Sequence, residues 1–287
     1  MKGLLLAAMI LCAVAAGAQT VIPGTLPRQW NPAGPRCTEV PDFEIREYNE
    51  DFFILRQSGC THPEKPFLFL LFGETRALLL DSGAGNVDVA RAVQTLRVLH
   101  AARHGGAVVP LLVAHSHAHG DHIAGDADLA KLPDVTVIGT RVDDVIVAFG
   151  LTGWPRVPSA YDLGGRTLDI IPIPGHEASS IAVYDRRTAI LLTGDTLYPG
   201  RLYVQEGRAF AESIQRLVTF TATRPVAHIL GTHIENSAIP FVDYPAGTVF
   251  QPDEHVLELG RAHLLELRDH LRAPLRFTVL RDFSIVP

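Results

Sequence analysis

The run His115-Ser-His-Ala-His-Gly-Asp-His122 constrains this chain more than any other feature, because it places four imidazoles and a carboxylate within eight residues. It follows the apolar stretch 108–113, which reads as a buried strand. In α/β sheets, active-site loops commonly follow the carboxyl ends of such strands. Neutral imidazole and carboxylate are ligands that suit zinc and neighbouring divalent metals. The sequence therefore predicts a metal site at the end of this strand.

The composition is typical of a folded chain with a large core. The chain has 287 residues, of which 47% are hydrophobic and 20% are charged, enough for one large domain or two small ones. The formal charge of −6 is spread without long blocks of one sign, so nothing indicates nucleic acid or an anionic membrane surface as a partner. We expect a small-molecule substrate, and the sequence leaves the oligomeric state open.

The first eighteen residues resemble a secretory signal peptide. Lys2 gives a positive start, residues 4–14 are apolar, and Ala16-Gly17-Ala18 offers small residues to a signal peptidase. The apolar run is too short to span a bilayer, so no stable membrane insertion is expected after cleavage. We expect an exported protein, periplasmic or secreted, that begins near Gln19. An uncleaved buried helix is the alternative.

Cys37 and Cys60 remain once the signal peptide is removed. Cysteines of exported chains often pair, so a disulfide between the proline-rich arm (23–41) and the first hairpin is expected, although the sequence alone leaves this open. Both residues are far in sequence from the candidate metal ligands. Neither is therefore expected to bind metal.

Hydrophobic periodicity predicts two rounds of strands and helices. Strands are predicted at 43–48, 52–55, 66–72, 76–80, 108–113, 135–138, 168–173, 181–184, 189–192, 226–230 and 277–280, and helices at 86–104, 126–132, 141–149, 209–222 and 254–272. Asn86 is the expected cap of the first helix. The order favours an α/β fold in which two sheets pack together with helices outside. We expect residues 19–64, the N-terminal arm and first strands, to pack on residues 65–287 as one domain.

Read in the frame His117-x-His119-x-Asp121-His122, the histidine run resembles the metal-binding signature of the metallo-β-lactamase-fold hydrolases. The resemblance covers roughly residues 65–235, where five pieces occur in the family's order: Asp81-Ser-Gly83, the histidine run, Pro174-Gly-His176, Thr193-Gly-Asp195 and Gly231-Thr-His233. It implies a metallo-β-lactamase-like αββα sandwich, that is, two packed mixed sheets with helices on the outer faces.

The resemblance also implies a ligand set. His117, His119 and His176 would bind a first metal ion and leave one position open for water, as a catalytic site requires. Asp121, His122 and His233 would bind a second ion, and Asp195 would bridge the two. Asp81 would support the metal loop without binding metal.

Among the remaining histidines, one is an alternative metal ligand and the others are expected not to bind the metal. His228 competes with His233 for the last ligand position, but it lies inside the apolar strand whereas His233 follows a glycine at its end, which favours His233. His115 is read as structural or as supporting a ligand from behind, because a frame shifted to include it has no Asp-His pair in place. Six further histidines are read as surface residues: His62, His100, His104, His255, His263 and His270.

The chemistry implied by the resemblance is that of a zinc-dependent hydrolase with two Zn²⁺ ions, iron or manganese being left open. A hydroxide between the ions would attack a carbonyl or ester centre of a small substrate, with a β-lactam as one candidate, and Asp121 would act as the catalytic residue that orients it. Two alternatives are a mono-iron sulfur dioxygenase of the same fold and a metal-binding protein without turnover. The cysteine-ligand lactamase subclass does not fit, because the chain has Asp195 in place of that cysteine.

Overall fold

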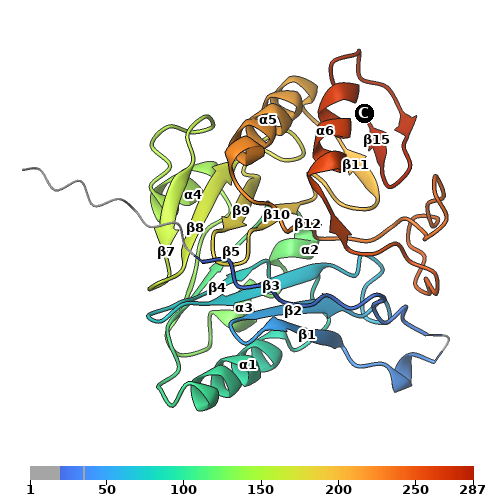
Figure 1. Cartoon of the computed structure of the whole chain (residues 1–287). Helices are drawn as coiled ribbons and strands as arrows, with labels where there is room; N and C mark the ends of the chain where they lie inside the picture. Colours follow the sequence, from blue (N-terminus) through green and yellow to red (C-terminus); the bar gives the residue numbers. More distant parts are fainter. Residues whose placement is uncertain (1–19, 35) are drawn as a thin grey trace, which may run out of the picture.

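The computed structural model describes residues 20–34 and 36–287. The expected signal peptide (1–18) lies outside the described residues. Two six-stranded sheets lie face to face, with helices on both outer sides (Figure 1). The predicted α/β sandwich is therefore confirmed.

The first sheet is mixed and has the order β1-β2-β3-β4-β5-β6. Its strands are β1 (Phe43–Asn49), β2 (Phe52–Gln57), β3 (Phe67–Phe72), β4 (Ala77–Leu80), β5 (Leu111–Ala114) and β6 (Val135–Val137). Strands β1 to β4 form an antiparallel meander, whereas β4, β5 and β6 run parallel. The parallel connections carry the helices α1 (Val89–Arg103), α2 (Gly120–Ile123) and α3 (Asp126–Leu129).

The second sheet has the order β13-β12-β10-β9-β8-β7, and a small third sheet has the order β11-β15-β14. The strands are β7 (Ser159–Asp162), β8 (Thr167–Pro172), β9 (Ile181–Asp185), β10 (Ile190–Gly194), β11 (Arg201–Tyr203), β12 (His228–Gly231), β13 (Glu258–Leu259), β14 (Thr278–Val279) and β15 (Ser284–Val286). The helices of this half are α4 (Val142–Phe149), α5 (Gly207–Phe220) and α6 (Arg261–His270). Among the described residues, no helix combines the length and apolar character needed to cross a membrane.

The central strands are buried on both faces, which explains their continuous hydrophobic sequences. In β3, Phe67, Phe69 and Leu71 face the core between the sheets. Leu68, Leu70 and Phe72 face the outer core under α1. Alternate residues of one strand therefore enter two different cores, because successive side chains point to opposite faces.

The predicted starts of the first and last helices are wrong. Asn86 does not cap the first helix: it has φ of 60°, and the Asp88 side chain accepts the Arg91 N–H instead. The last helix begins at Arg261 and not at 254, because Glu258–Leu259 pairs with β12 as an edge strand. Hydrogen bonding across the sheet therefore overrides the local pattern there.

The N-terminal arm runs across the body and is tied to it by the expected disulfide. Cys37 and Cys60 form the bond across a sequence separation of 23 residues. Cys60 lies in the loop 58–66 that connects β2 to β3, so the bond holds this loop against the arm. The same loop reaches the site described next.

Candidate metal centre

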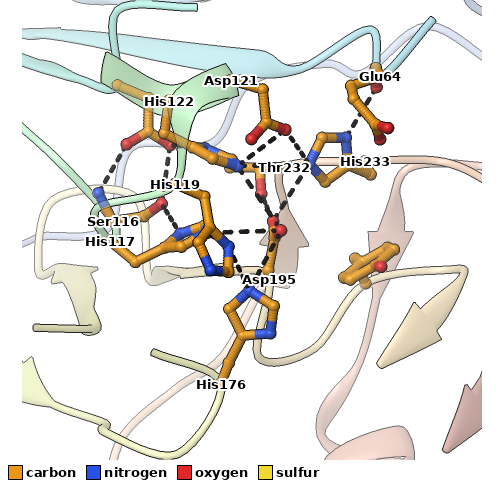
Figure 2. A network of polar contacts seen from close by, with 12 residues as sticks. Glu64, Ser116, His117, His119, Asp121, His122, His176, Asp195, Thr232 and His233 are labelled. Atoms are coloured by element: carbon orange, nitrogen blue, oxygen red, sulfur yellow. Dashed lines mark hydrogen bonds and ion pairs between the residues drawn. The ribbon is translucent and has the colours of Figure 1, made fainter. Parts of the chain in front are cut away.

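Four loops that follow β5, β8, β10 and β12 meet at one edge of the sandwich and bring the seven candidate ligands together (Figure 2). Four of the ligands come from the histidine run, at and around α2, and the other three come from far along the chain. Gly194 makes one of these approaches possible. A Cβ on Gly194 would lie 2.7 Å from the Cβ of Ser116, and its φ of 53° is one that glycine adopts freely.

One group of ligand atoms gathers His117, His119, His176 and Asp195. The Nδ1 atom of His119 lies 2.9 Å from Nε2 of His117 and 3.1 Å from Nε2 of His176. Asp195 Oδ2 lies 3.6 Å from Nε2 of both His117 and His176. Three imidazoles and one carboxylate oxygen therefore converge on one point.

A second group gathers Asp121, His122 and His233. Asp121 Oδ2 lies 3.3 Å from His122 Nε2 and 3.4 Å from His233 Nε2, and the two Nε2 atoms are 3.4 Å apart. The carboxylate of Asp195 also borders this group, with Oδ1 3.3 Å from His233 Nε2 and Oδ2 3.6 Å from His122 Nε2. Asp195 thus lies between both groups.

These spacings fit tetrahedral metal ions. A zinc ion with bonds of about 2.1 Å has ligand atoms about 3.4 Å apart. The atoms of the second group match this spacing closely, and those of the first group straddle it. The donor set of imidazole and carboxylate also suits zinc, iron or manganese.

Four of the five ligand histidines have a second partner that fixes the ring. His122 Nδ1 lies 3.0 Å from Asp81 Oδ2, and His117 Nδ1 lies 3.1 Å from the Ser116 hydroxyl. His176 Nδ1 donates to the Tyr203 carbonyl and His233 Nδ1 to the Glu64 carbonyl, each at 2.8 Å. Each ring therefore presents its Nε2 atom to the centre.

Asp81 is buried behind the histidine run and does not reach the centre. Its carboxylate accepts the N–H of Ser116 at 2.6 Å and the hydroxyl of Ser116 at 2.9 Å, in addition to its contact with His122. Asp81 follows β4 with φ of 69°, an unusual conformation for a non-glycine residue. Asp81 therefore contacts both the backbone of the histidine run and one ligand ring.

The electrostatics of the metal-free centre follow from burying acids and bases together. Burial lowers the pKa of His122 and of His233, but attraction to Asp195 and further contacts with carboxylates outweigh it, so both pKa values lie well above the usual one. Burial raises the pKa of Asp195, but His233, His122 and His117 hold it well below its usual value. Burial keeps the pKa of His117 low. The carboxylate of Asp195 thus stays ionised.

The other histidines fall outside this centre. His228 begins β12 and lies against the Tyr48 ring, with centroids 6.3 Å apart, whereas His233 lies in the centre. His115 is buried and contacts Asp126 Oδ1 at 2.8 Å. The surface prediction for His100 is wrong, because its ring is buried between Phe72 and His104.

A cavity of about 500 Å³ opens onto the centre, and several of its wall residues were not identified from the sequence as part of the site. They are His62, Glu64, Gln205 and Glu235. His62 is half-buried in this wall. Tyr198 and Tyr203 also line this cavity. No local motif marks the other four, because they reach the cavity only through the packing of distant loops.

Comparison with known proteins gives a consistent match. Residues 66–233, more than half of the chain, match the family described as the metallo-beta-lactamase superfamily. A hydroxyacylglutathione hydrolase from Xanthomonas euvesicatoria pv. vesicatoria is 31% identical over 163 residues, which cover 52% of this chain and 54% of that protein. An acyl-coenzyme A thioesterase from Bos taurus is 27% identical over 187 residues, covering 55% of this chain and 67% of that protein. The chain spans about half the length of the first curated relatives it matches.

Solved structures agree on the fold. A metallo-beta-lactamase from Pontibacter korlensis superposes with a TM-score of 0.51 at 16% identity, covering 80% of this chain and 99% of that one. At this identity the likeness concerns the arrangement of the sheets and helices.

Proposed function

Because the chain belongs to the metallo-β-lactamase superfamily, we propose that it is a zinc-dependent hydrolase that holds two ions in the centre described above. The observation that carries the proposal is the pair of ligand groups joined by Asp195. Every ligand atom of the second group lies 3.3 to 3.4 Å from its neighbours in that group, a spacing that suits an occupied ion site. A single-ion site would not need Asp121, His122 and His233 gathered in this way.

In this proposal His117, His119 and His176 hold the first ion, Asp121, His122 and His233 hold the second, and Asp195 bridges them. Zinc bound in such a site would lower the pKa of a bound water to about 7 and would polarise a carbonyl oxygen. Asp121 borders the cavity, so its carboxylate also orients the attacking water. The carboxylate of Asp81 keeps His122 in the tautomer that offers Nε2.

The names of the curated relatives support esters and thioesters as the first substrates to consider, because one is a hydroxyacylglutathione hydrolase and another an acyl-coenzyme A thioesterase. The reaction is the addition of water to a carbonyl carbon with loss of an alcohol or a thiol. A β-lactam is a further candidate, since it also presents a carbonyl carbon.

We further propose that the protein is exported, to the periplasm or the medium. The disulfide between Cys37 and Cys60 supports an oxidising compartment. Fractionation of the producing cells followed by N-terminal sequencing tests this. A mature terminus near Gln19 in the exported fraction is expected, and a cytoplasmic chain that retains Met1 would contradict it.

The decisive experiment combines metal analysis with hydrolysis assays on the purified mature chain. We expect about two zinc ions per chain, and hydrolysis of esters or thioesters that stops when the ions are chelated and returns when zinc is added. A single iron with oxygen-dependent turnover of a sulfur compound would assign the chain to the dioxygenases. Two bound ions without turnover of any ester, thioester, lactone or β-lactam would leave a metal-binding protein.

A further inference from the structure

Two cavities approach the metal centre from different sides, and they meet at His119, His176 and Gln205. The first, of about 500 Å³, lies on the side of His233, and Glu64 and Glu235 are among its wall residues. The second, of about 630 Å³, lies between α4 and α5, and Trp154 is among its wall residues. A substrate bound across the centre would occupy both.

The walls of both cavities carry negative charge only, apart from the histidines. Glu64 and Glu235 line the first cavity, and Glu177 and Glu206 line the second. Among the described residues that line either cavity, none is a lysine or an arginine. Proteins recognise carboxylate and phosphate groups mainly with Arg and Lys side chains. The cavity walls therefore offer no such partner to an anionic substrate.

Two cations beside the wall residues of the first cavity, Arg201 and Lys65, are already paired. Arg201 Nη2 lies 2.6 Å from Glu235 Oε1, and Arg201 also donates to the Tyr244 carbonyl. Lys65 is buried, its Nζ donates to the Thr248 carbonyl at 3.0 Å, and burial lowers its pKa to about 8. These groups hold the loops around the cavity together and do not present charge to its interior.

Arg56 belongs to the same buried layer. Its guanidinium forms a two-pronged pair with the carboxylate of Glu254 at 2.5 Å, and Lys65 Nζ lies 3.8 Å from the same carboxylate. The charge of Glu254 is thus shared by two cations. Glu64, in contrast, is exposed at the cavity wall.

Glu64 has separate roles for its backbone and its side chain. Its carbonyl accepts the hydrogen of His233 Nδ1. Figure 2 shows its carboxylate on the His233 side of the centre, at the far side from His176. A substitution at this position changes the charge of the cavity and keeps the carbonyl that orients His233.

The second cavity has a different character. Trp154, Val142, Ala178 and Ala209 give it an apolar wall, and the indole of Trp154 packs partly on the core between the sheets. An apolar acyl group would be removed from water here. Glu177 uses its carboxylate internally, on the N–H and hydroxyl of Ser179.

We infer that this site hydrolyses esters or thioesters that carry an apolar acyl group and a cationic leaving group, with Glu64 as the carboxylate that recognises the positive charge. This inference rests on the proposed hydrolase function and specifies its substrate class. In the reaction, water adds to the acyl carbon, the bond from this carbon to the sulfur or oxygen breaks, and the leaving group departs as a thiol or alcohol with one proton. An anionic leaving group would instead face the carboxylate of Glu64.

Three butyryl thioesters with one acyl group test this directly: those of thiocholine, 2-mercaptoethanol and mercaptoacetate, which are cationic, neutral and anionic. The zinc-loaded protein is assayed by thiol release, and kcat and KM are measured for each. We expect kcat/KM to fall from the cationic to the anionic thioester by about tenfold, the size of one attractive and one repulsive contact at a partly exposed carboxylate. The preference should shrink as the salt concentration rises.

Variants at Glu64 distinguish an effect of its charge on substrate preference from an effect of the substitution on the structure. Glu64→Lys should reverse the order of the two charged thioesters, mainly through KM, and Glu64→Gln should bring them close together. The matched control is Glu50→Lys, which makes the same charge change in the turn between β1 and β2, at the opposite end of these strands from the site. Glu50→Lys should keep the order of the wild-type protein.

The outcomes discriminate between the two proposals. Hydrolysis of all three thioesters without a charge preference, or with a preference for mercaptoacetate, would overturn the inference on substrate class and leave the hydrolase intact. The inference on substrate class would also fail, with the hydrolase intact, if Glu64→Lys changed the relative kcat/KM of the three thioesters no more than Glu50→Lys does. Two bound zinc ions with hydrolysis of none of the thioesters, nor of any oxygen ester, lactone or β-lactam, would overturn both.

Discussion

Asp81 and His122 are joined by a contact of 3.0 Å between Oδ2 and Nδ1, although they are 41 residues apart, and both side chains are fully buried. The contact links the end of β4 to the loop after β5, where Asp81 also binds both polar groups of Ser116. One carboxylate thereby fixes the backbone of the histidine run and the orientation of one ligand ring.

Asp81→Asn should weaken metal binding at the second group by about 10- to 100-fold, because the amide does not hold the His122 ring in the same tautomer. Competition with a chelator of known affinity measures the effect. Asp88→Asn, which alters only the cap of α1, is the matched control and should keep the wild-type affinity. Equal affinities in the two variants would contradict the role of Asp81.

Asp195→Ala should reduce the metal content below two ions per chain and abolish hydrolysis, because its carboxylate borders both ligand groups. Metal analysis after gel filtration and a steady-state assay test this. His228→Ala is the control, since its ring contacts Tyr48 away from the centre, and it should retain both ions. Full activity of Asp195→Ala would mean that Asp195 does not bridge the two ions. Loss of an ion in His228→Ala would mean that His228, and not His233, is the last ligand.

Metal binding should release protons near neutral pH. In the metal-free protein, burial lowers the pKa values of His122 and His233, but the surrounding carboxylates raise both well above the usual value, so these rings are protonated there. A metal ion needs neutral rings and must displace those protons. Titration calorimetry in buffers of different ionisation enthalpy should show proton release that diminishes as the pH rises through the raised pKa values. Heats that do not depend on the buffer would be inconsistent with protonated rings.

Asp185→Ala should destabilise the fold by about 3–5 kcal/mol, because it leaves the fully buried Arg166 guanidinium without its carboxylate. Arg166 also donates to the carbonyls of Asp51 and Phe72 in the other sheet, so the pair connects both layers. Urea unfolding measures the free energy. Asp128→Ala removes an exposed partner of Lys131 and should cost less than about 1 kcal/mol. Similar losses in both variants would be the contrary result.

Replacing Cys37 and Cys60 together by serine should lower stability by about 3 kcal/mol, as expected for a loop of this length. The loop 58–66 should also loosen, and with it the Glu64 carbonyl that orients His233. The second ion should therefore bind more weakly than in the wild type, while the first ion is little affected. Thermal unfolding measures the loss of stability, and stepwise metal titration measures the affinity for each ion. An unchanged affinity for the second ion would show that the disulfide does not support the metal site.

The local sequence predicted much of this protein's fold and many of the candidate ligands. The residues His117, His119, Asp121 and His122 are close in sequence, so one loop after one buried strand presents them all, and periodicity located most strands and helices. The resemblance to a family added His176, Asp195 and His233, and the structure brings these residues to the same point. Asn86 and the start of α6 were misassigned where hydrogen bonding and pairing with a distant strand decided the boundary.

The tertiary structure alone determined the contacts between segments that are far apart in the chain. The Glu64 carbonyl meets His233 across 169 residues, and no local pattern of either segment contains that contact. The buried position of His100, the pairing of Arg201 with Glu235 and the cavity walls without lysine or arginine likewise follow from how loops pack. Sequence patterns record the period of a helix or strand and the chemistry of a short loop. The charge and shape that select a substrate are set only when the packed sheets bring their loop ends together.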